Sequence, residues 1–281
     1  MEDIIIRDEK NFGEKKKRIL KAGVGKFHVL ADFDLTLTKA NIDGIKTQSI
    51  MKYLRNGNYL TSDYAKKANE LFDRYHPYEI DSRISHEEKM AKMKEWWTTH
   101  FKLLIDSGLD KKTLDRFVQD VKLEFREGTK EFLEFLDKHN IPLMIISSSG
   151  LGSVIPMYLK REGMLYDNIS VVANLFEFNE KGIVTKVKEP IIHSFNKSEV
   201  TLNHLPIYRE LLKRKNVLLL GDSLGDLGMI EGFDYENLLT IGFLNENVEN
   251  NLETYKKKFD VVIPNDGSFE FVNDFVKGFE K

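Results

Sequence analysis

Two aspartates one residue apart follow an apolar run near the start of the chain. The segment VLADFDLTLTKA (29–40) changes abruptly from aliphatic residues to Asp32 and Asp34. The segment LLLGDSLGDLGM has the same form, with Asp222 and Asp226 directly after an apolar run. Clustered carboxylates repel one another and are costly to bury unless a cation lies among them. If the two segments meet in space, these four side chains could bind a metal ion that takes oxygen ligands.

A group of serines stands at the end of a third apolar run. The run PLMII (142–146) leads into Ser147, Ser148, Ser149 and Gly150. In an open parallel sheet, ligands bind beyond the carboxyl ends of the strands. An isolated Asp-x-Asp pair is most often a loop or a cap, and an isolated serine cluster before glycine is most often a helix cap. Three such groups, each directly after an apolar run, instead predict one site, and magnesium suits its oxygen donors because it is often shared with a substrate phosphate.

The elements that must position these groups form an alternating series. Six apolar runs have the length and composition of buried parallel strands, and helical patterns, such as those at 129–139 and 153–163, separate most of them. This alternation predicts an α/β fold with a doubly wound, Rossmann-like parallel sheet covered by helices on both faces. The runs are FHVLA (27–31), PLMII (142–146), ISVVA (169–173), NVLLL (216–220), LLTIGF (238–243) and the weaker DVVIP (260–264).

One part of the chain breaks the alternation. Between about 44 and 125 there is no strand-like run, and apolar residues recur at spacings of three and four, which indicates amphipathic helices. We therefore expect a helical block inserted after the first strand of the sheet. A second exception is 174–189, where we expect a β-hairpin with Asn-Glu-Lys-Gly as its turn.

Composition restricts the class of protein. The chain has 281 residues, 41% of them hydrophobic, which is enough for a large core, and it has no cysteine, which excludes disulfides, thiolate metal sites and cysteine nucleophiles. Its net charge of −3 supplies no positive field for polymeric nucleic acid or anionic membranes. The N-terminal segment is too polar for a signal peptide, and no run approaches the ~18 residues of a membrane span. We expect a soluble, cytoplasmic monomer that acts on a small molecule.

With these motifs the chain resembles the haloacid dehalogenase superfamily of aspartyl phosphotransferases. DFDLTLT is similar to the first motif of that superfamily, Ser147 stands at its second, Lys197 in HSFNKS at its third, and GDSLGD at its fourth. The resemblance implies that Asp32 is the nucleophile, and that Asp34 first protonates the leaving alcohol and then activates water. This division suits the chemistry, because a covalent intermediate splits one hard step into two and one carboxyl group must move a proton in both.

The same resemblance implies ligands for a magnesium ion and for the phosphoryl group. Mg²⁺ would be held by Asp32, the main-chain carbonyl of Asp34 and Asp222, with Asp226 as a further candidate ligand. The phosphoryl oxygens would be neutralised and oriented by Lys197, Ser147 and Ser148.

A closer resemblance, from about residue 15 to the C-terminus, is to the type III cytosolic 5′-nucleotidases, which include the pyrimidine and the 7-methylguanosine monophosphate nucleotidases. In that family the helical insertion is a cap that closes over the active site. The resemblance implies a haloacid dehalogenase-like core of residues 1–43 and 126–281, and a cap of residues 44–125 that determines specificity. The similar segments are HPYEID (76–81), EWWTTH (95–100), FREGTKEF (125–132), IPLMIISSSGLG (141–152), IIHSFNKS (191–198), LLLGDSLGDLGMIEG (218–232) and IGFLNENVE (241–249).

The cap of such an enzyme supplies the contacts to the nucleobase. By the resemblance, Glu79 accepts hydrogen bonds from the base, Trp97 stacks on it, and His100 lies near it, where relatives carry a small polar residue. Taken alone, Glu79 would be a solvated helix residue and Trp96-Trp97 a core pair. The resemblance favours a base contact for Glu79 and Trp97 and leaves Trp96 in the core of the cap.

Some alternatives stay open. The family usually reads Ser-Ala-Gly where this chain has Ser147-Ser148-Ser149-Gly150, so the phosphate ligand is Ser147 or Ser148, and we expect Ser147. The expected function is magnesium-dependent hydrolysis of CMP, UMP or 7-methyl-GMP to nucleoside and phosphate. Two other readings are a phosphatase of the same superfamily for another small ester, such as phosphoserine or a sugar phosphate, and an inactive nucleotide-binding module. The tryptophan pair argues against a phosphatase for another small ester, because such an enzyme needs no stacking surface. The intact Asp34 argues against an inactive binding module, because such a module needs no acid–base group.

Overall fold

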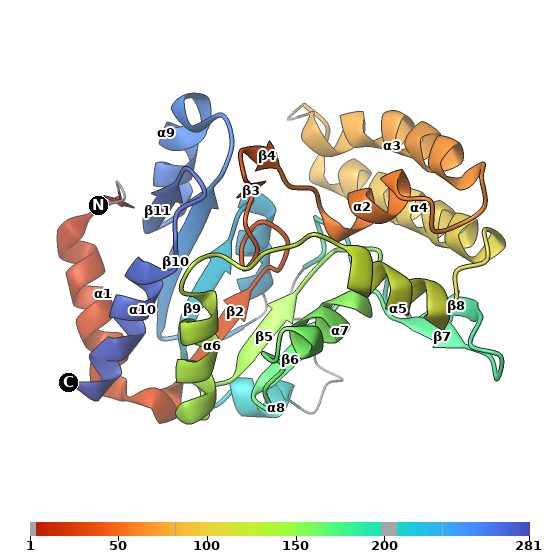
Figure 1. Ribbon diagram of the computed structural model, residues 1–281. Helices are drawn as coiled ribbons and strands as arrows, with labels where there is room; N and C mark the ends of the chain where they lie inside the picture. Colours follow the sequence, from red (N-terminus) through yellow and green to blue (C-terminus); the bar gives the residue numbers. More distant parts are fainter. Residues whose placement is uncertain (1–3, 82, 198–206, 232) are drawn as a thin grey trace.

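A computed structural model of the chain describes residues 4–81, 83–197, 207–231 and 233–281 (Figure 1). At its centre lies a seven-stranded sheet in the order β1-β11-β10-β9-β2-β5-β6. Neighbouring strands are parallel, except that β1 pairs antiparallel with β11 at one edge. The six apolar runs form strands as predicted, whereas the two-residue β1 is too short to be recognised from a pattern. The strands are β1 (Ile5–Ile6), β2 (Phe27–Ala31), β5 (Leu143–Ile146), β6 (Ile169–Val172), β9 (Asn216–Gly221), β10 (Asn237–Leu244) and β11 (Val261–Pro264).

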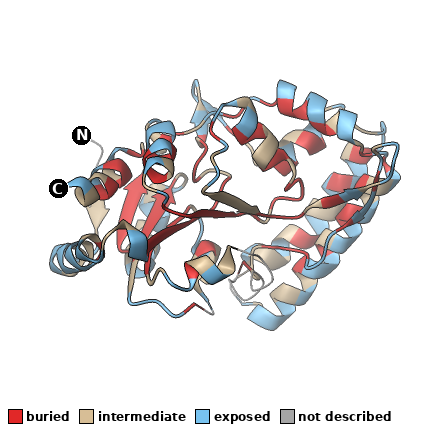
Figure 2. Ribbon diagram, turned by 90° about the horizontal axis from the view of Figure 1, so that it is seen from below, coloured by how far each residue is buried: buried red, intermediate tan, exposed pale blue. Residues whose placement is uncertain are grey.

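The central strands are apolar on both faces, so helices cover the sheet on both sides. In β9, Leu218 and Leu220 join one hydrophobic cluster while Val217 and Leu219 join another, because successive side chains of a strand point to opposite faces. Helices α1, α6, α7 and α10 contribute apolar residues to the first cluster, and α8 and α9 to the second. The buried residues accordingly gather on the strands and the inner sides of the helices (Figure 2). These helices are α1 (Glu9–Ala22), α6 (Thr129–Lys138), α7 (Val154–Arg161), α8 (Tyr208–Leu211), α9 (Val248–Lys258) and α10 (Glu270–Val276).

The expected helical block follows β2 and begins with a short hairpin of two strands. Several of its helices begin at a capping side chain: Ser49 accepts from the amide of Lys52, and Ser85 accepts from the amide of Glu88. The two longest helices, α3 and α4, pack against each other beside the carboxyl edge of the sheet (Figure 1). The elements of this block are β3 (Asn41–Ile42), β4 (Ile45–Lys46), α2 (Ile50–Asn56), α3 (Tyr64–Ile80), α4 (His86–Asp106) and α5 (Lys111–Asp120).

The chain leaves and re-enters the sheet layer through two paired segments. Thr38 pairs antiparallel with Phe125, and the Lys39 amide donates to the Glu124 carbonyl at 2.8 Å. These contacts place the outgoing segment at Thr38–Lys39 beside the returning segment at Glu124–Phe125, close to the expected boundaries between core and cap. The division into a core of 1–43 and 126–281 and a cap of 44–125 stays a prediction.

The predicted hairpin forms, but away from the sheet. Strands β7 (Phe176–Phe178) and β8 (Val184–Val187) are joined through a turn that Gly182 closes with a φ of +78°, a conformation that favours glycine. The hairpin is anchored on the insertion, because the Lys111 amide donates to the Gly182 carbonyl and the Val184 amide donates to the Leu109 carbonyl. Within the described residues, no helix is long and apolar enough to cross a membrane.

Candidate active site

The carboxyl ends of three adjacent strands bring the predicted groups together. Asp32 follows β2, Ser147 follows β5 and Asp222 follows β9, and β2 lies between the other two strands. The register is fixed by main-chain bonds, for example from the Asp32 amide to the Leu220 carbonyl at 3.0 Å. A cavity of about 250 Å³ opens between this edge and the insertion. Its lining includes every predicted site residue except His100: Asp32, Asp34, Glu79, Trp97, Ser147, Ser148, Lys197, Asp222 and Asp226.

A buried lysine links two of the aspartates. The Lys197 ammonium donates to Asp32 Oδ1 at 2.5 Å and to Asp226 Oδ1 at 2.9 Å, and its side chain is only 6% exposed. Burial raises the pKa of Asp32 to about 7, against the opposing charge of Lys197. Burial disfavours the charged form of Lys197 as well, but the carboxylates of Asp226 and Asp32 outweigh it and raise the lysine pKa above its ordinary value. Lys197 is therefore a fixed positive charge beside Asp32.

Three carboxylates form a compact cluster that fits a hard cation. Asp32, Asp222 and Asp226 each offer an oxygen within 4.8 Å of the others. Burial raises the pKa of Asp222 well above its ordinary value, and the charges of Asp226 and Asp32 raise it further. A divalent cation would relieve this repulsion, and carboxylate oxygens are the ligands that Mg²⁺ prefers. The donor set therefore fits the expected ion.

Within that cluster, the oxygens of Asp226 already have protein partners. Its Oδ2 accepts hydrogen bonds from the Asp222 amide and from both the amide and the hydroxyl of Ser223, at 2.8–3.1 Å. Its Oδ1 accepts from Lys197. Asp226 therefore holds the turn after β9 and the lysine in place, while it also lines the cavity with Asp32 and Asp222.

Asp34 has different surroundings from Asp32. Its Oδ1 accepts from the amide of Ile50, the first residue of α2, at 3.2 Å. Burial raises the pKa of Asp34 to about 6, although the Ile50 amide and the charge of Lys197 oppose the shift. A carboxyl group with this pKa can both donate and accept a proton near neutral pH.

The serine loop lies on the other side of Asp32. Ser147 is buried, and its Oγ accepts from the amide of Ser149 at 3.1 Å, while Ser148 is more exposed. Both line the cavity, so the choice between them as phosphate ligand stays a prediction. Gly150 is required here, because a Cβ at this position would lie 2.5 Å from the ring of Trp97 and 2.9 Å from the sulfur of Met51.

Two helices of the insertion supply the opposite wall. Glu79, near the end of α3, accepts from the Ser194 hydroxyl at 2.7 Å, which is a direct contact between the insertion and the loop that carries Lys197. Trp97, on α4, lines the cavity and stacks against Trp96 and Phe101. The wall therefore combines a carboxylate with a flat aromatic side chain.

A model of the pyrimidine 5′-nucleotidase (UMPH-1) family matches residues 35–280 of the chain. The chain belongs to this family. It is 34% identical over 273 residues to 7-methylguanosine phosphate-specific 5′-nucleotidase A of Xenopus laevis. This match covers 97% of this chain and 94% of the relative. The corresponding human enzyme is 32% identical over 275 residues, covering 98% and 91%.

Solved structures of a 5′-nucleotidase and of a phosphoserine phosphatase share the fold. Cytosolic 5′-nucleotidase IIIB bound to cytidine superposes with a TM-score of 0.91 at 28% identity, covering 100% of this chain and 94% of the other. A phosphoserine phosphatase matches at 15% identity and a TM-score of 0.52, covering 89% and 98%, which shows a shared fold alone. The expected family, the haloacid dehalogenase-type fold and the expectation of a 5′-nucleotidase are confirmed.

One predicted site residue of this family member is displaced from the cavity. His100 is 2% exposed, and its Nε2 lies 3.0 Å from the hydroxyl of Tyr64 on α3. Burial lowers the pKa of His100 to about 3, so the ring is neutral, and it does not line the cavity. In this structure α4 turns the side chain of His100 into the interface with α3, which does not favour the predicted contact with the base; that contact stays a prediction. Trp96 is buried against Tyr75, as predicted.

The structure of this nucleotidase also contains site residues that sequence reasoning missed. Thr36 donates to Asp222 Oδ1 at 3.4 Å, and Tyr255 donates to the Asp222 carbonyl at 2.5 Å. Thr36 belongs to the DFDLTLT motif, so its position was a usable signal. Ser194 and Arg126 also lie inside quoted motifs, but only the tertiary contacts reveal their partners.

Proposed function

We propose that the chain hydrolyses nucleoside 5′-monophosphates to nucleoside and phosphate through an aspartyl-phosphate on Asp32. The observation that best supports this proposal is a single cavity with two different walls. Asp32 lies beside Lys197 at the sheet edge, and Glu79 and Trp97 lie on the helices opposite. The names of the relatives support a nucleotide substrate, since some are 7-methylguanosine phosphate-specific and a solved relative holds cytidine. We propose that the substrates of this chain are the pyrimidine nucleotides CMP and UMP, the purine nucleotide 7-methyl-GMP, or all three.

In the first half-reaction, a carboxylate oxygen of Asp32 attacks phosphorus and the bond from phosphorus to the 5′ oxygen breaks. Protonated Asp34 gives its proton to that leaving oxygen, and its raised pKa of about 6 keeps a useful protonated fraction. Lys197, bonded to Asp32 and Asp226, orients the nucleophile and presents positive charge to the phosphoryl oxygens.

In the second half-reaction, water hydrolyses the aspartyl-phosphate that the first half-reaction forms. Asp34, now ionised, takes a proton from a water molecule, which attacks phosphorus. The bond between phosphorus and the Asp32 oxygen breaks, phosphate is released and Asp32 returns to its carboxylate form. The amide of Ile50 holds Asp34 in one position for both transfers.

Mg²⁺ fits the carboxylate cluster, and we assign Asp32, Asp222 and the main-chain carbonyl of Asp34 to hold it. The ion would supply the positive charge that lets an anionic nucleophile approach an anionic phosphate. Asp226 is assigned to positioning Lys197 and the turn that carries Asp222, because its oxygens accept hydrogen bonds from those groups.

The remaining predicted residues are assigned to substrate binding. Ser147 and Ser148 would bind the phosphoryl oxygens through a hydroxyl and an amide, with Ser147 as the principal ligand. Glu79, which also accepts from the Ser194 hydroxyl, would accept from the exocyclic amine of cytosine or from the N–H edge of 7-methylguanine. Trp97 would stack on the base, a contact worth about 1–3 kcal/mol. The word "cytosolic" in the names of relatives supports a cytoplasmic location.

A substrate panel tests this proposal. Phosphate release is measured for CMP, UMP, AMP, GMP, 7-methyl-GMP, phosphoserine and a sugar phosphate, with magnesium and after its removal by chelation. We expect magnesium-dependent release with the highest kcat/KM for CMP, UMP or 7-methyl-GMP. A higher kcat/KM for phosphoserine or the sugar phosphate would contradict the substrate class, and release that survives chelation would contradict the role of the ion.

A further inference from the structure

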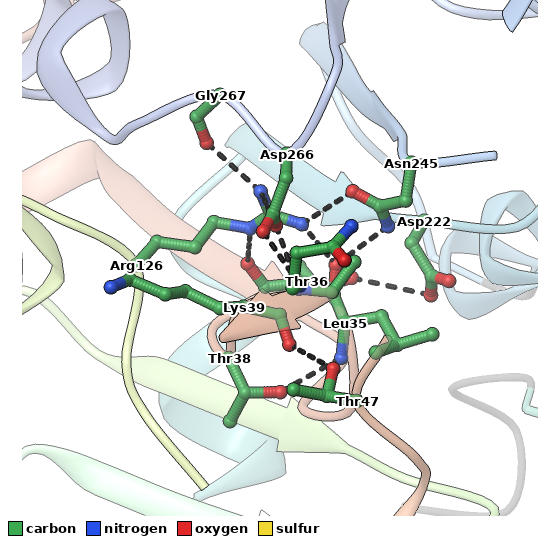
Figure 3. Close-up of polar contacts among 12 residues, drawn as sticks. Leu35, Thr36, Thr38, Lys39, Thr47, Arg126, Asp222, Asn245, Asp266 and Gly267 are labelled. Carbon is green, nitrogen blue, oxygen red and sulfur yellow. Dashed lines mark hydrogen bonds and ion pairs between the residues drawn. The ribbon is translucent and has the colours of Figure 1, made fainter. Parts of the chain in front are cut away.

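A buried arginine lies where the chain returns from the insertion to the sheet layer. Arg126 stands between α5 and α6, and its side chain is 0% exposed. Its guanidinium group makes contacts in several directions at once (Figure 3). The partners are the carbonyls of Thr36 (2.8 Å), Gly267 (2.9 Å) and Leu35, Asn245 Oδ1 (2.6 Å) and the Asp266 carboxylate (2.8 Å).

These partners belong to three different loops at the carboxyl edge of the sheet. Leu35 and Thr36 follow the Asp34 position, Asn245 follows β10, and Asp266 and Gly267 follow β11. Arginine suits such a position, because its planar group carries five N–H donors in a fixed fork and stays charged. The face of the group also lies over the ring of Phe243 on β10, 4.5 Å from its centroid.

The first consequence concerns Asp34. Leu35, the next residue, has a φ of +62°, a left-handed conformation that is costly for a residue with a side chain. Its carbonyl accepts from Arg126 and also from the Asn245 amide group, at 3.0 Å for the latter. The backbone beside Asp34 is therefore held in an unfavourable conformation by two donors from outside the loop.

The second consequence concerns Asp222. The Thr36 carbonyl accepts from Arg126 Nε, and the Thr36 hydroxyl donates to Asp222 Oδ1. One residue thus connects the arginine to the carboxylate at the end of β9, as the dashed lines of Figure 3 show.

The third consequence concerns the junction with the insertion. The Arg126 amide donates to the Leu37 carbonyl at 3.0 Å, so main chain and side chain bind consecutive parts of one loop. Asp266, the ion-pair partner of Arg126, accepts from the amides of Ala40 and Asn41 at 2.7 and 2.8 Å. The same pair therefore holds the outgoing chain as well as the returning one.

We propose that Arg126 is a positioning residue for phosphoryl transfer: it fixes the Leu35–Thr36 backbone, and through it Asp34 and Asp222, to the junction between the insertion and the sheet. This inference rests on the roles proposed above for those two aspartates. Misplacing reacting groups by about 1 Å can cost about 100-fold in rate. Loss of Arg126 should therefore lower kcat far more than it raises KM.

The test combines a deletion of the guanidinium group with its replacement from solution. Arg126→Ala is assayed with p-nitrophenyl phosphate and with CMP, with and without millimolar guanidinium chloride, and with sodium chloride at equal ionic strength. We expect kcat to fall about 100-fold on both esters with a much smaller change in KM, and guanidinium alone to restore at least about tenfold. No fall in kcat, or a fall that guanidinium does not reverse better than sodium chloride, would overturn the inference.

Arg214 is the matched control, because it also binds main-chain carbonyls but beside the amino end of β2, away from the cavity. Its guanidinium donates to the carbonyls of Val24 at 2.8 Å and Phe27 at 3.2 Å. Arg214→Ala should lower the melting temperature and leave kcat near the wild-type value, with no response to guanidinium. Equal losses of kcat in the two variants would mean that Arg126 matters only for stability, which contradicts the proposal.

Asn245→Ala tests the same contacts at a lower cost to folding, should Arg126→Ala not fold. This variant removes the hydrogen bond that Asn245 donates to the Leu35 carbonyl and the one that it accepts from Arg126. We expect a smaller fall in kcat than in Arg126→Ala, again without a matching rise in KM. An unchanged kcat would count against the proposal.

Activity of the wild type on p-nitrophenyl phosphate but not on nucleotides would refute the proposed function, while the comparison of variants on that ester still decides the role of Arg126.

Discussion

Asp32 and Asp34 lie one residue apart, yet their surroundings give the two carboxyl groups different partners. Asp32 accepts from the Lys197 ammonium, whereas Asp34 accepts from the main-chain amide of Ile50. The positive charge of Lys197 orients the first carboxyl group for attack and opposes the rise in its pKa that burial causes. An uncharged partner leaves the second free to exchange its proton. Different environments therefore allow two chemically identical groups to take two roles.

The proton-transfer role of Asp34 gives a prediction that depends on the leaving group. In Asp34→Asn the hydrogen bond from Ile50 can persist, but no proton can be donated to the leaving oxygen. We expect kcat for CMP to fall roughly 10²–10⁴-fold, and kcat for p-nitrophenyl phosphate to fall less, because p-nitrophenolate leaves without protonation. Steady-state kinetics on both esters measure the difference. Equal losses would mean that Asp34 has a structural role instead.

Elements, rather than single residues, separate catalysis from specificity in this fold. The strands β2, β5 and β9 end at the reacting groups, while α3 and α4 carry Glu79 and Trp97. The bond between Glu79 and Ser194 joins these two sets across the cavity. Glu79 is therefore the point at which a bound base would meet both sets of elements.

This arrangement predicts a selective effect of Glu79→Ala. KM for CMP should rise about tenfold, the equivalent of about 1.4 kcal/mol, while p-nitrophenyl phosphate, which has no base, should be hydrolysed as before. Glu95→Ala is the matched control, because Glu95 is a glutamate of α4 that bonds to Tyr75 and does not line the cavity. A loss on both esters in Glu79→Ala, or an equal rise in KM in Glu95→Ala, would contradict base recognition by Glu79.

Secondary-structure elements were predictable where the pattern is local. Apolar runs indicated β2, β5 and β9, and the polar residues directly after them indicated the site, because parallel strands bring their carboxyl ends to one edge. The side-chain direction of His100 was not predictable, because it depends on how α3 packs on α4. The side-chain partners of Arg126 lie between 90 and 141 residues from it along the chain, and no local pattern in the sequence indicates them.

For the molecule as a whole, buried histidines make stability depend on pH. His28 in β2 is 0% exposed; its Nδ1 donates to the Arg214 carbonyl, while its Nε2 has no hydrogen-bond partner among the described residues. Burial lowers the pKa of His28 to about 4, against an ordinary value of 6.5. Between these values the unfolded chain binds a proton that the folded chain does not. Stability should therefore fall as the pH falls through this window and be independent of His28 above it.

The variant His28→Asn isolates this contribution, since asparagine retains an amide donor for the Arg214 carbonyl but does not titrate. Urea unfolding at about pH 7 and about pH 5 should show the wild type losing about 2 kcal/mol more than the variant. The comparison is needed because the raised pKa values of Asp32 and Asp34 act in the opposite direction: the folded chain binds protons there more readily than the unfolded chain. An identical change in both proteins would contradict a neutral buried His28.

The most direct test of the proposed mechanism is to find the phosphoryl group on Asp32. The enzyme is quenched with acid during turnover of phosphorus-radiolabelled CMP, digested and mapped by mass spectrometry. We predict label on the peptide that contains Asp32, and neither label nor phosphate release in Asp32→Asn, which keeps the shape of the side chain but has no attacking carboxylate. Label on another residue, or undiminished phosphate release by a folded Asp32→Asn, would contradict the central claim.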